Sequence, residues 1–442
     1  MRKKIVLQMN ISKMITVILL SVAFVTKLNS ITVPWYFCYL VCCPLIPFLL
    51  VEYYNDKYRE VKRMTVCVLF YALIPYLAGL AYTLLLMLFH NSGRLNPTVR
   101  AISEIGQMVY ILFFTALVFA KFREEVIDIL SEALVLSYLY SLIVAFVNIG
   151  VSGFVEYIST VALNRTEMVL WFERHDIGLS IGMLLMCELF MRKKKRPMLI
   201  MMMFIVMYLC HKRIAFCAFA VMIVLQLCVR KSSDEVKIAT INIVLISVSV
   251  ICMVYIWLIA SGHLYSLSEQ IGIDFSGRKN LFDAVKDLYR WSVAFQGNGF
   301  GFTGKYLSSI AGTSYAHKLG SETYKMVHSD ILKTYVDLGF TGSMLWFIWQ
   351  TWKFPKVIAH KFGQDAKVTY CLVTVYTYII YMTDNTSTYF IFQVVLYSVV
   401  MYGCYMSSNR DMGLINFLRS CTDIKNMRRI KISVYTIFSG RK

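Results

Sequence analysis

The chain has 442 residues, of which 58% are hydrophobic and only 16% are charged. Soluble domains average about 25% charged residues, so the composition excludes an ordinary soluble protein and predicts a polytopic membrane protein. The 45 basic residues outnumber the 26 acidic ones, which would suit nucleic-acid binding. The basic residues fall between apolar segments, however, where they act as topology signals. No nucleic-acid partner is therefore expected.

The twelve cysteines give no reason to expect a metal, a redox centre or another cofactor. All except Cys421 fall within apolar segments, and none forms a CxxC pair or a zinc-ligand spacing. Scattered cysteines of this kind behave as small hydrophobic residues.

Apolar segments of the length that crosses a bilayer, about 20 residues, follow one another along the chain. The first follows Met-Arg-Lys-Lys and lacks a small-residue cleavage site, which predicts a retained helix rather than a signal peptide. The twelve candidate spans are 11–29, 32–52, 64–89, 101–120, 126–149, 176–191, 197–210, 213–229, 238–261, 329–352, 367–384 and 388–405. The sequence thus predicts an all-α fold of about twelve transmembrane helices in one integral membrane domain, residues 1–442, with a basic tail at 406–442.

The basic residues between the spans predict the orientation, because cytoplasmic segments carry the excess of lysine and arginine. With the N-terminus inside, alternate segments obey this rule. The cytoplasmic segments are then the N-terminal end, 53–63, 121–125, 192–196, 230–237, 353–366 and the tail. The long hydrophilic segment 262–327 and His328 are expected to face outward.

That long loop contains Ser276-Gly277-Arg278, followed by apolar residues at helical spacing over 279–293. This pattern predicts an amphipathic helix at the membrane surface, where an anion could be shared between the helix start and Arg278. A plain surface role is the alternative for Arg278. Arg290 in the same stretch is a further candidate for substrate binding. Gly299-Phe-Gly-Phe-Thr-Gly304 satisfies G-x-G-x-x-G but lacks the strand–turn–helix setting, so we expect tight loop packing over the active site rather than dinucleotide binding.

The run from His328 to Ser343 places a histidine, two carboxylates and a lysine at the mouth of a span. Ionisable groups inside a bilayer are costly and indicate function by default. Ser329 or Asp330 can cap the helix, and Asp330 is also expected to bind substrate or orient His328. Lys333 and Asp337 form an i,i+4 pair, whose structural alternative is mutual neutralisation. For His328 the alternative is a solvated loop histidine.

Two other basic clusters fall on the predicted outer side. His211-Lys212-Arg213 joins two spans with almost no loop, which suits a phosphate site or, alternatively, two snorkelling side chains at a turn. Arg174 and His175, in Phe-Glu-Arg-His-Asp-Ile-Gly, lie just before the sixth span. Arg213 is a candidate catalytic residue, and Lys212 and Arg174 are candidates for substrate binding.

Together, the His328 run, Ser276-Gly277-Arg278 and the glycine-rich stretch resemble the O-antigen polymerase and O-antigen ligase superfamily over about a hundred residues. The resemblance implies a GT-C type glycosyltransferase that uses undecaprenyl-diphosphate-linked oligosaccharides without a metal or cofactor. It implies that His328 is essential and that Arg278 and Arg213 contribute to catalysis. The family's Ser-Arg pair is Lys212-Arg213 here, and the Pro-Asn that often follows the region of Arg174 is missing.

The resemblance further implies a bacterial cytoplasmic (inner) membrane location, with the active site facing outward, membrane lipid as surroundings and a chain-length regulator as a partner. The expected reaction is polymerisation of lipid-linked repeat units of an O-antigen, capsule or exopolysaccharide. Transfer to lipid A core or to a protein by a ligase uses the same motifs and remains open. A flippase or other transporter would predict charges along mid-membrane pathways and two related halves, neither of which the sequence indicates.

We expect the topology to be measurable by cysteine labelling. In whole cells, and in a background without accessible native cysteines, a cysteine at Ser308 should react with an impermeant thiol reagent because residues 262–327 are predicted to be external. A cysteine at Ser233 is the matched internal position. Protection at Ser308 together with labelling at Ser233 would reverse the predicted orientation.

Overall fold

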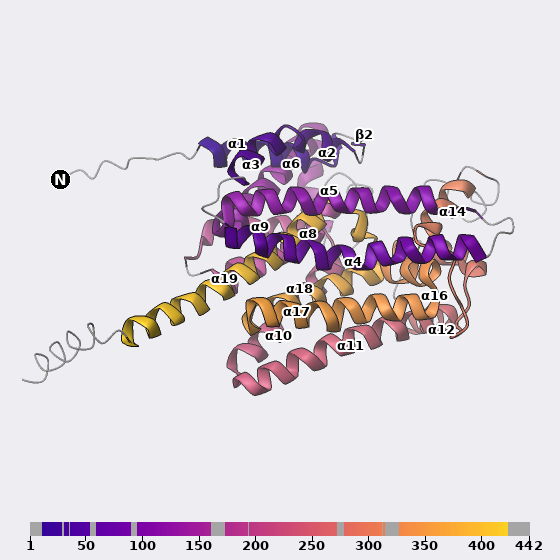
Figure 1. The fold of residues 1–442 in the computed structure, drawn as a ribbon. Helices are drawn as coiled ribbons and strands as arrows, with labels where there is room; N and C mark the ends of the chain where they lie inside the picture. Colours follow the sequence, from indigo (N-terminus) through magenta and orange to yellow (C-terminus); the bar gives the residue numbers. More distant parts are fainter. Residues whose placement is uncertain are drawn as a thin grey trace, which may run out of the picture.

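The computed structural model describes residues 11–28, 31–34, 36–53, 59–89, 95–160, 173–192, 194–271, 278–311, 313 and 327–422. Within these ranges the regular structure is helical, apart from one antiparallel pair of two-residue strands, β1 (Lys27–Leu28) and β2 (Ile31–Thr32). Long helices run alongside one another as a bundle (Figure 1). Helices α12 and α14 lie at one end, here called the loop end, and the C-terminal part of α19 projects from the opposite end (Figure 1).

The helices of the first half of the chain are α1 (Ile11–Ala23), α2 (Phe37–Cys42), α3 (Leu45–Tyr53), α4 (Arg59–Phe89), α5 (Thr98–Phe122), η2 (Arg123–Glu125), α6 (Val126–Thr160), α8 (His175–Met186), η3 (Cys187–Met191), α9 (Pro197–Leu209) and α10 (Arg213–Lys231). Those of the second half are α11 (Asp234–Ala260), α12 (His263–Ile271), α13 (Arg278–Ala284), η4 (Lys286–Leu288), α14 (Phe302–Ile310), α16 (Asp330–Ile348), η5 (Trp349–Lys353), α17 (Phe354–Phe362), α18 (Gln364–Thr383), η6 (Thr386–Thr388) and α19 (Phe390–Thr422).

Helix α18 lies at the centre of the bundle, in contact with α10, α11, α16, α17 and α19. Helix α11 lies at the periphery and exposes apolar side chains such as Ile243, with 64% of its surface accessible, and Val250 with 55%. Exposing apolar surface to water costs about 25 cal/mol per Å², so apolar faces of this kind suit a lipid environment. The long, apolar helices are those of a membrane protein.

Every one of the twelve predicted spans is largely helical, but the structure does not confirm twelve crossings. Within the described residues, five helical stretches are long and apolar enough to cross a membrane: Glu60–Phe89, Thr98–Tyr157, Arg213–Lys231, Asp234–Ala260 and Phe390–Ser408. Helices α1 and α9 have only 13 residues each. At 1.5 Å per residue such a helix is roughly 20 Å long, shorter than the hydrocarbon core of about 30 Å.

Several predicted boundaries differ from the structure, for example the end of α6, which runs to Thr160 instead of residue 149. The span predicted at 32–52 is divided into α2 and α3. The amphipathic helix predicted over 279–293 ends at Ala284, and the backbone is extended at Tyr289, because this face packs beneath α16 rather than along a surface. Helix α19 continues to Thr422, past the predicted end at residue 405.

At the end opposite the loop end, segments that the basic-residue pattern assigns to one side of the membrane contact each other. Arg196 bonds Glu132 at 2.6 Å and Glu188 at 3.0 Å, and Arg192 pairs with Asp128. Lys237, in the first turn of α11, lies 2.7 Å from Asp365 at the start of α18. The Lys237–Asp365 pair joins two segments that are predicted to be cytoplasmic, whereas Asp128, Glu132 and Glu188 lie within predicted spans, so the orientation stays a prediction.

The glycine-rich segment packs directly against α16, as its composition predicts. Gly297 and Gly339 both have positive φ angles, 82° and 70°, and their backbones touch. A Cβ atom on Gly297 would lie 2.4 Å from the Gly339 nitrogen, closer than any side chain tolerates. Gly339 also interrupts the helical geometry of α16, which bends α16 around the loop.

We therefore expect Gly297→Ala to destabilise the protein by about 2 kcal/mol or more, because the positive φ and the backbone clash add. Gly106→Ala is the matched control, since its added methyl group meets no atom within 4 Å and replaces a glycine in the middle of α5. Thermal unfolding of detergent-purified protein measures both. Equal melting temperatures for Gly297→Ala and wild type would contradict the contact.

Candidate functional site

A cleft of about 580 Å³ opens near the loop end of the bundle, and we refer to it as the loop-end cleft. Its walls come from the end of α1, the residues on either side of the β1–β2 hairpin, α2, α5, α8, α14, η6, α19 and the residues before α16. The charged and other polar residues in its lining include Arg100, Gln107, Glu173, His175, Asp176, Ser308, His328, Asn385 and Thr388. Segments predicted to face outward thus meet around one hollow, although they lie far apart in the sequence.

His328 lines this cleft, as the sequence predicts for a catalytic residue. Its side chain is 25% exposed, and its Nδ1 atom lies 3.8 Å from Oδ1 of the buried Asp384. Its φ angle is 50°, in the left-handed region, which is uncommon for a residue other than glycine and is often found at functional sites. A carboxylate beside one ring nitrogen orients an imidazole and stabilises its protonated form.

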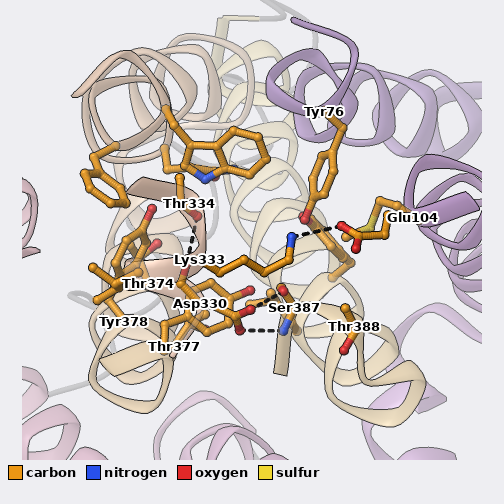
Figure 2. A pocket seen from close by; sticks show the side chains of 18 of the residues that line it. Tyr76, Glu104, Asp330, Lys333, Thr334, Thr374, Thr377, Tyr378, Ser387 and Thr388 are labelled. Atoms are coloured by element: carbon orange, nitrogen blue, oxygen red, sulfur yellow. Dashed lines mark hydrogen bonds and ion pairs between the residues drawn. The ribbon is translucent and has the colours of Figure 1, made fainter. Parts of the chain in front are cut away.

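The sequence suggested Asp330 as the carboxylate that orients His328, but the carboxylate that pairs with His328 in the structure is Asp384, so an orienting role for Asp330 stays a prediction. Ser329 caps α16 by accepting a hydrogen bond from the Leu332 nitrogen. The side chain of Asp330 points into the bundle, where it accepts hydrogen bonds from the backbone nitrogen and hydroxyl of Ser387 (Figure 2). The neighbouring carboxylate Asp384 takes the position that sequence reasoning gave to Asp330.

Asp330 lines a second, smaller cavity of about 70 Å³, here called the inner chamber. Figure 2 shows Lys333 reaching across it to Glu104, with tyrosine and threonine side chains around them. Gln107 and Thr388 line both the inner chamber and the loop-end cleft, so the two hollows adjoin. Ionisable groups therefore extend from the cleft into the interior of the bundle.

The charged groups around the chamber form one continuous chain of ion pairs. Nε of Arg100 lies 3.0 Å from Glu104, whose other oxygen lies 2.9 Å from Nζ of Lys333. Lys333 is 3.3 Å from Asp337, which confirms the predicted i,i+4 pair. Asp337 also accepts hydrogen bonds from the backbone of Gly301 at 3.0 Å and of Thr303 at 2.8 Å, and so caps α14 from another helix.

The cluster before α8 is largely neutralised within itself. Lys212 is buried and lies 2.8 Å from Glu173, and Nε2 of His175 lies 3.6 Å from the other oxygen of Glu173. Arg174 is only 2% exposed and donates from Nη1 to the carbonyl oxygen of Glu173. Burial lowers the pKa of Arg174 from the ordinary arginine value, but arginine stays protonated at neutral pH. Arg174 and Lys212 therefore support the cleft wall, whereas Glu173 and His175 line the cleft.

The remaining predicted site residues lie elsewhere. Arg213 begins α10, is exposed, and lines neither the loop-end cleft nor the inner chamber. Arg290 is exposed on a separate hollow beside the glycine-rich segment. Arg278 begins α13, but its side chain and the preceding Ser276-Gly277 lie outside the described residues, so its role stays a prediction.

Several residues of the cleft and chamber escaped sequence reasoning. Arg100 and Glu104 stand four residues apart at the start of an apolar span, and Asp384-Asn385 stand between two spans. An acidic or amide residue next to a span is a signal that could have been used, because such groups are costly near the bilayer. Nothing in the sequence pairs Glu104 with Lys333, which is 229 positions away.

The fold and the site define an α-helical membrane protein with an ionisable cleft near one end of its bundle. A scan against protein-family models and a search of curated protein sequences find no match to this chain.

We expect Lys333→Met to lower the free energy of unfolding by about 3 kcal/mol, because it leaves buried carboxylates without their shared cation. Lys237→Met is the matched control: it removes the same group from the partly exposed pair with Asp365 and should cost about 0–1 kcal/mol. Denaturant titration of the purified proteins measures both. Adding Glu104→Gln to Lys333→Met should recover part of the loss, and a Lys333→Met protein as stable as wild type would contradict the ion-pair chain.

Proposed function

We propose that this chain is a membrane glycosyltransferase that polymerises lipid-linked repeat units of a bacterial polysaccharide on the outer face of the cytoplasmic membrane. The observation that carries the proposal is the loop-end cleft, which His328 lines together with Arg100 and His175, with Asp384 beside the His328 ring. The motif resemblance of the His328 run and of the glycine-rich loop supplies the choice of reaction. The donor is an oligosaccharide on undecaprenyl diphosphate, and the acceptor is a sugar hydroxyl of another lipid-linked unit.

In the proposed reaction, the acceptor oxygen attacks the anomeric carbon of the donor and the bond from that carbon to the diphosphate oxygen breaks. The acceptor proton passes to His328, and the diphosphate leaves with the bonding electron pair. Asp384 favours the imidazolium that forms, as a carboxylate behind a catalytic histidine does. Cationic groups stabilise the charge that grows on the leaving group.

The walls of the cleft suit an amphipathic donor of this kind. Pro34, Phe37, Phe390 and Ile391 form an apolar part of the lining, while Arg100 and the two histidines form a polar part. A polyprenyl chain requires an apolar surface and its diphosphate requires cations, so one cleft satisfies both requirements. An O-antigen ligase would need the same arrangement, and only the acceptor would differ.

A polysaccharide transporter is the second candidate, and the inner chamber favours it. Asp330, Lys333 and Glu104 are buried inside the bundle, whereas the sequence had indicated polar groups at one face only. Buried ionisable residues are typical of transport pathways. Purified protein in vesicles distinguishes the two: a transporter moves lipid-linked sugars across the bilayer without lengthening them.

His328→Ala should abolish chain extension while the protein still inserts and accumulates. General-base catalysis contributes about 10²–10⁴-fold, so turnover of synthetic lipid-linked repeats by purified enzyme should fall by at least 100-fold. Asp384→Asn should reduce turnover less than His328→Ala does, because it removes the carboxylate beside the ring but leaves the imidazole itself in the cleft. His328→Gln keeps a polar amide but cannot take up the proton, and should be as inactive as His328→Ala.

His263→Ala is the matched control, since His263 is an exposed histidine of the same long loop and lines neither the cleft nor the chamber. It should retain wild-type turnover. Activity of purified His328→Ala within about tenfold of wild type would remove His328 as the general base. Wild-type protein that transports but never extends lipid-linked repeats would replace the polymerase by the transporter.

A further inference from the structure

Among the described residues, Arg100 is the arginine that lines the loop-end cleft. One nitrogen of its guanidinium is bonded to the protein, and the other two are available to a ligand. Its side chain is 31% exposed. In the described part of the chain, Nε bonds Glu104, and neither Nη atom has a hydrogen bond to protein. A guanidinium fixed through Nε keeps its two Nη groups in a fork that matches two phosphate oxygens.

The charge on Glu104 does not cancel that of Arg100, because Glu104 is also paired with Lys333 at 2.9 Å. Lys333 in turn shares Asp337, whose charge is offset by the backbone nitrogens of Gly301 and Thr303 at the start of α14. Each interior carboxylate thus has partners besides the arginine. Within the cleft, Glu173 is paired with Lys212, which leaves Asp176 and the buried Asp384 as the other acids near Arg100 and the histidines.

The glycine-rich loop fits closely around this arginine. A Cβ atom at Gly304 would lie 3.2 Å from Nε and 3.5 Å from Nη2 of Arg100. Gly304 is buried at the start of α14, so a larger residue there must displace the guanidinium rather than turn away from it. The glycine at position 304 therefore leaves the space that the Arg100 guanidinium occupies.

We infer that Arg100 binds the diphosphate of the lipid-linked donor in the loop-end cleft, and that Gly304 positions it. This inference rests on the proposed function, and it assigns the diphosphate to a residue outside the three motifs that carry the family resemblance. The ligand chemistry is a diphosphate group, whether it is attached to a polyprenyl chain or free. Arg213, which is exposed and lines neither hollow, is not part of this diphosphate site.

The test measures binding of radiolabelled farnesyl diphosphate to the full-length protein in nanodiscs. Arg100→Gln should weaken binding about 10- to 100-fold, the range for losing hydrogen bonds to a charged group. Arg100→Lys should fall between wild type and Arg100→Gln, because it keeps the charge but not the fork. Lys305→Gln is the matched control, since Lys305 is an exposed cation next to Gly304 that lines neither hollow, and it should bind as wild type does.

Gly304→Ala separates charge from position. It keeps every charged group, and the atom it meets is the end of a flexible side chain, so the protein should fold and still bind farnesyl diphosphate several-fold more weakly. If Arg100→Gln does not fold, Gly304→Ala and Arg100→Lys decide the matter. Competition by inorganic pyrophosphate would show that the diphosphate alone is recognised, and lack of competition would show that the prenyl chain is also required; both outcomes support the site if the variants weaken binding.

Two outcomes overturn the inference while leaving the proposed function intact. One is an Arg100→Gln protein that binds as tightly as wild type. The other concerns competition. If nanodiscs that contain phosphatidylglycerol displace farnesyl diphosphate from the protein as effectively as pyrophosphate does, the site is a general surface for anionic lipids. Absence of farnesyl diphosphate binding by wild type up to about 1 mM would instead count against the proposed function and this inference together.

Discussion

The loop end of the bundle depends on the interactions of one buried carboxylate, that of Asp337. It accepts hydrogen bonds from Gly301 and Thr303 and pairs with Lys333, so it joins the glycine-rich loop to α16. Through Lys333 and Glu104 the same chain of charges reaches Arg100 on α5. A charge so deeply buried is tolerated only when ion pairs and hydrogen bonds satisfy it. The connection therefore requires these particular partners and not only close packing.

The loop-end cleft follows from that connection. Because the loop is held to α16 by Asp337 and by the Gly297–Gly339 backbone contact, its helix α14 takes a fixed place at the cleft wall. His328 precedes α16, and Asp384 follows α18, so the two central helices bring the histidine and its carboxylate together. The hairpin and α2 complete the wall from the other side.

Much of the fold could be predicted from the sequence, because the apolar pattern of a bilayer-spanning segment is local. The positions of the helical segments are an example. The pattern could not say which segments cross, since α1 and α9 have only 13 residues each and α16 is interrupted at Gly339. For the site, the sequence singled out His328 because it stands next to a span, and the structure places it in the loop-end cleft, while its catalytic role stays a prediction. Asp384, Glu104 and Arg100 were not singled out, because their contacts join helices that are distant in the sequence. For Asp330, sequence distance to His328 does not reveal which way a helix turns its side chains.

The i,i+4 spacing of Lys333 and Asp337 also bears on how α16 enters the membrane. A single charged residue at the centre of a span raises the cost of insertion by about 2.5–3.5 kcal/mol, and α16 carries several ionisable residues. Lys333 and Asp337 can neutralise each other within one helical turn, before Glu104 or the loop is in place. Asp330 shares the charge of Lys333, three residues on, but the hydrogen bonds to its carboxylate come from Ser387, which is synthesised more than fifty residues later. During biogenesis α16 therefore remains incompletely satisfied until α18 has followed it, so the two helices are best suited to enter the bilayer as a pair.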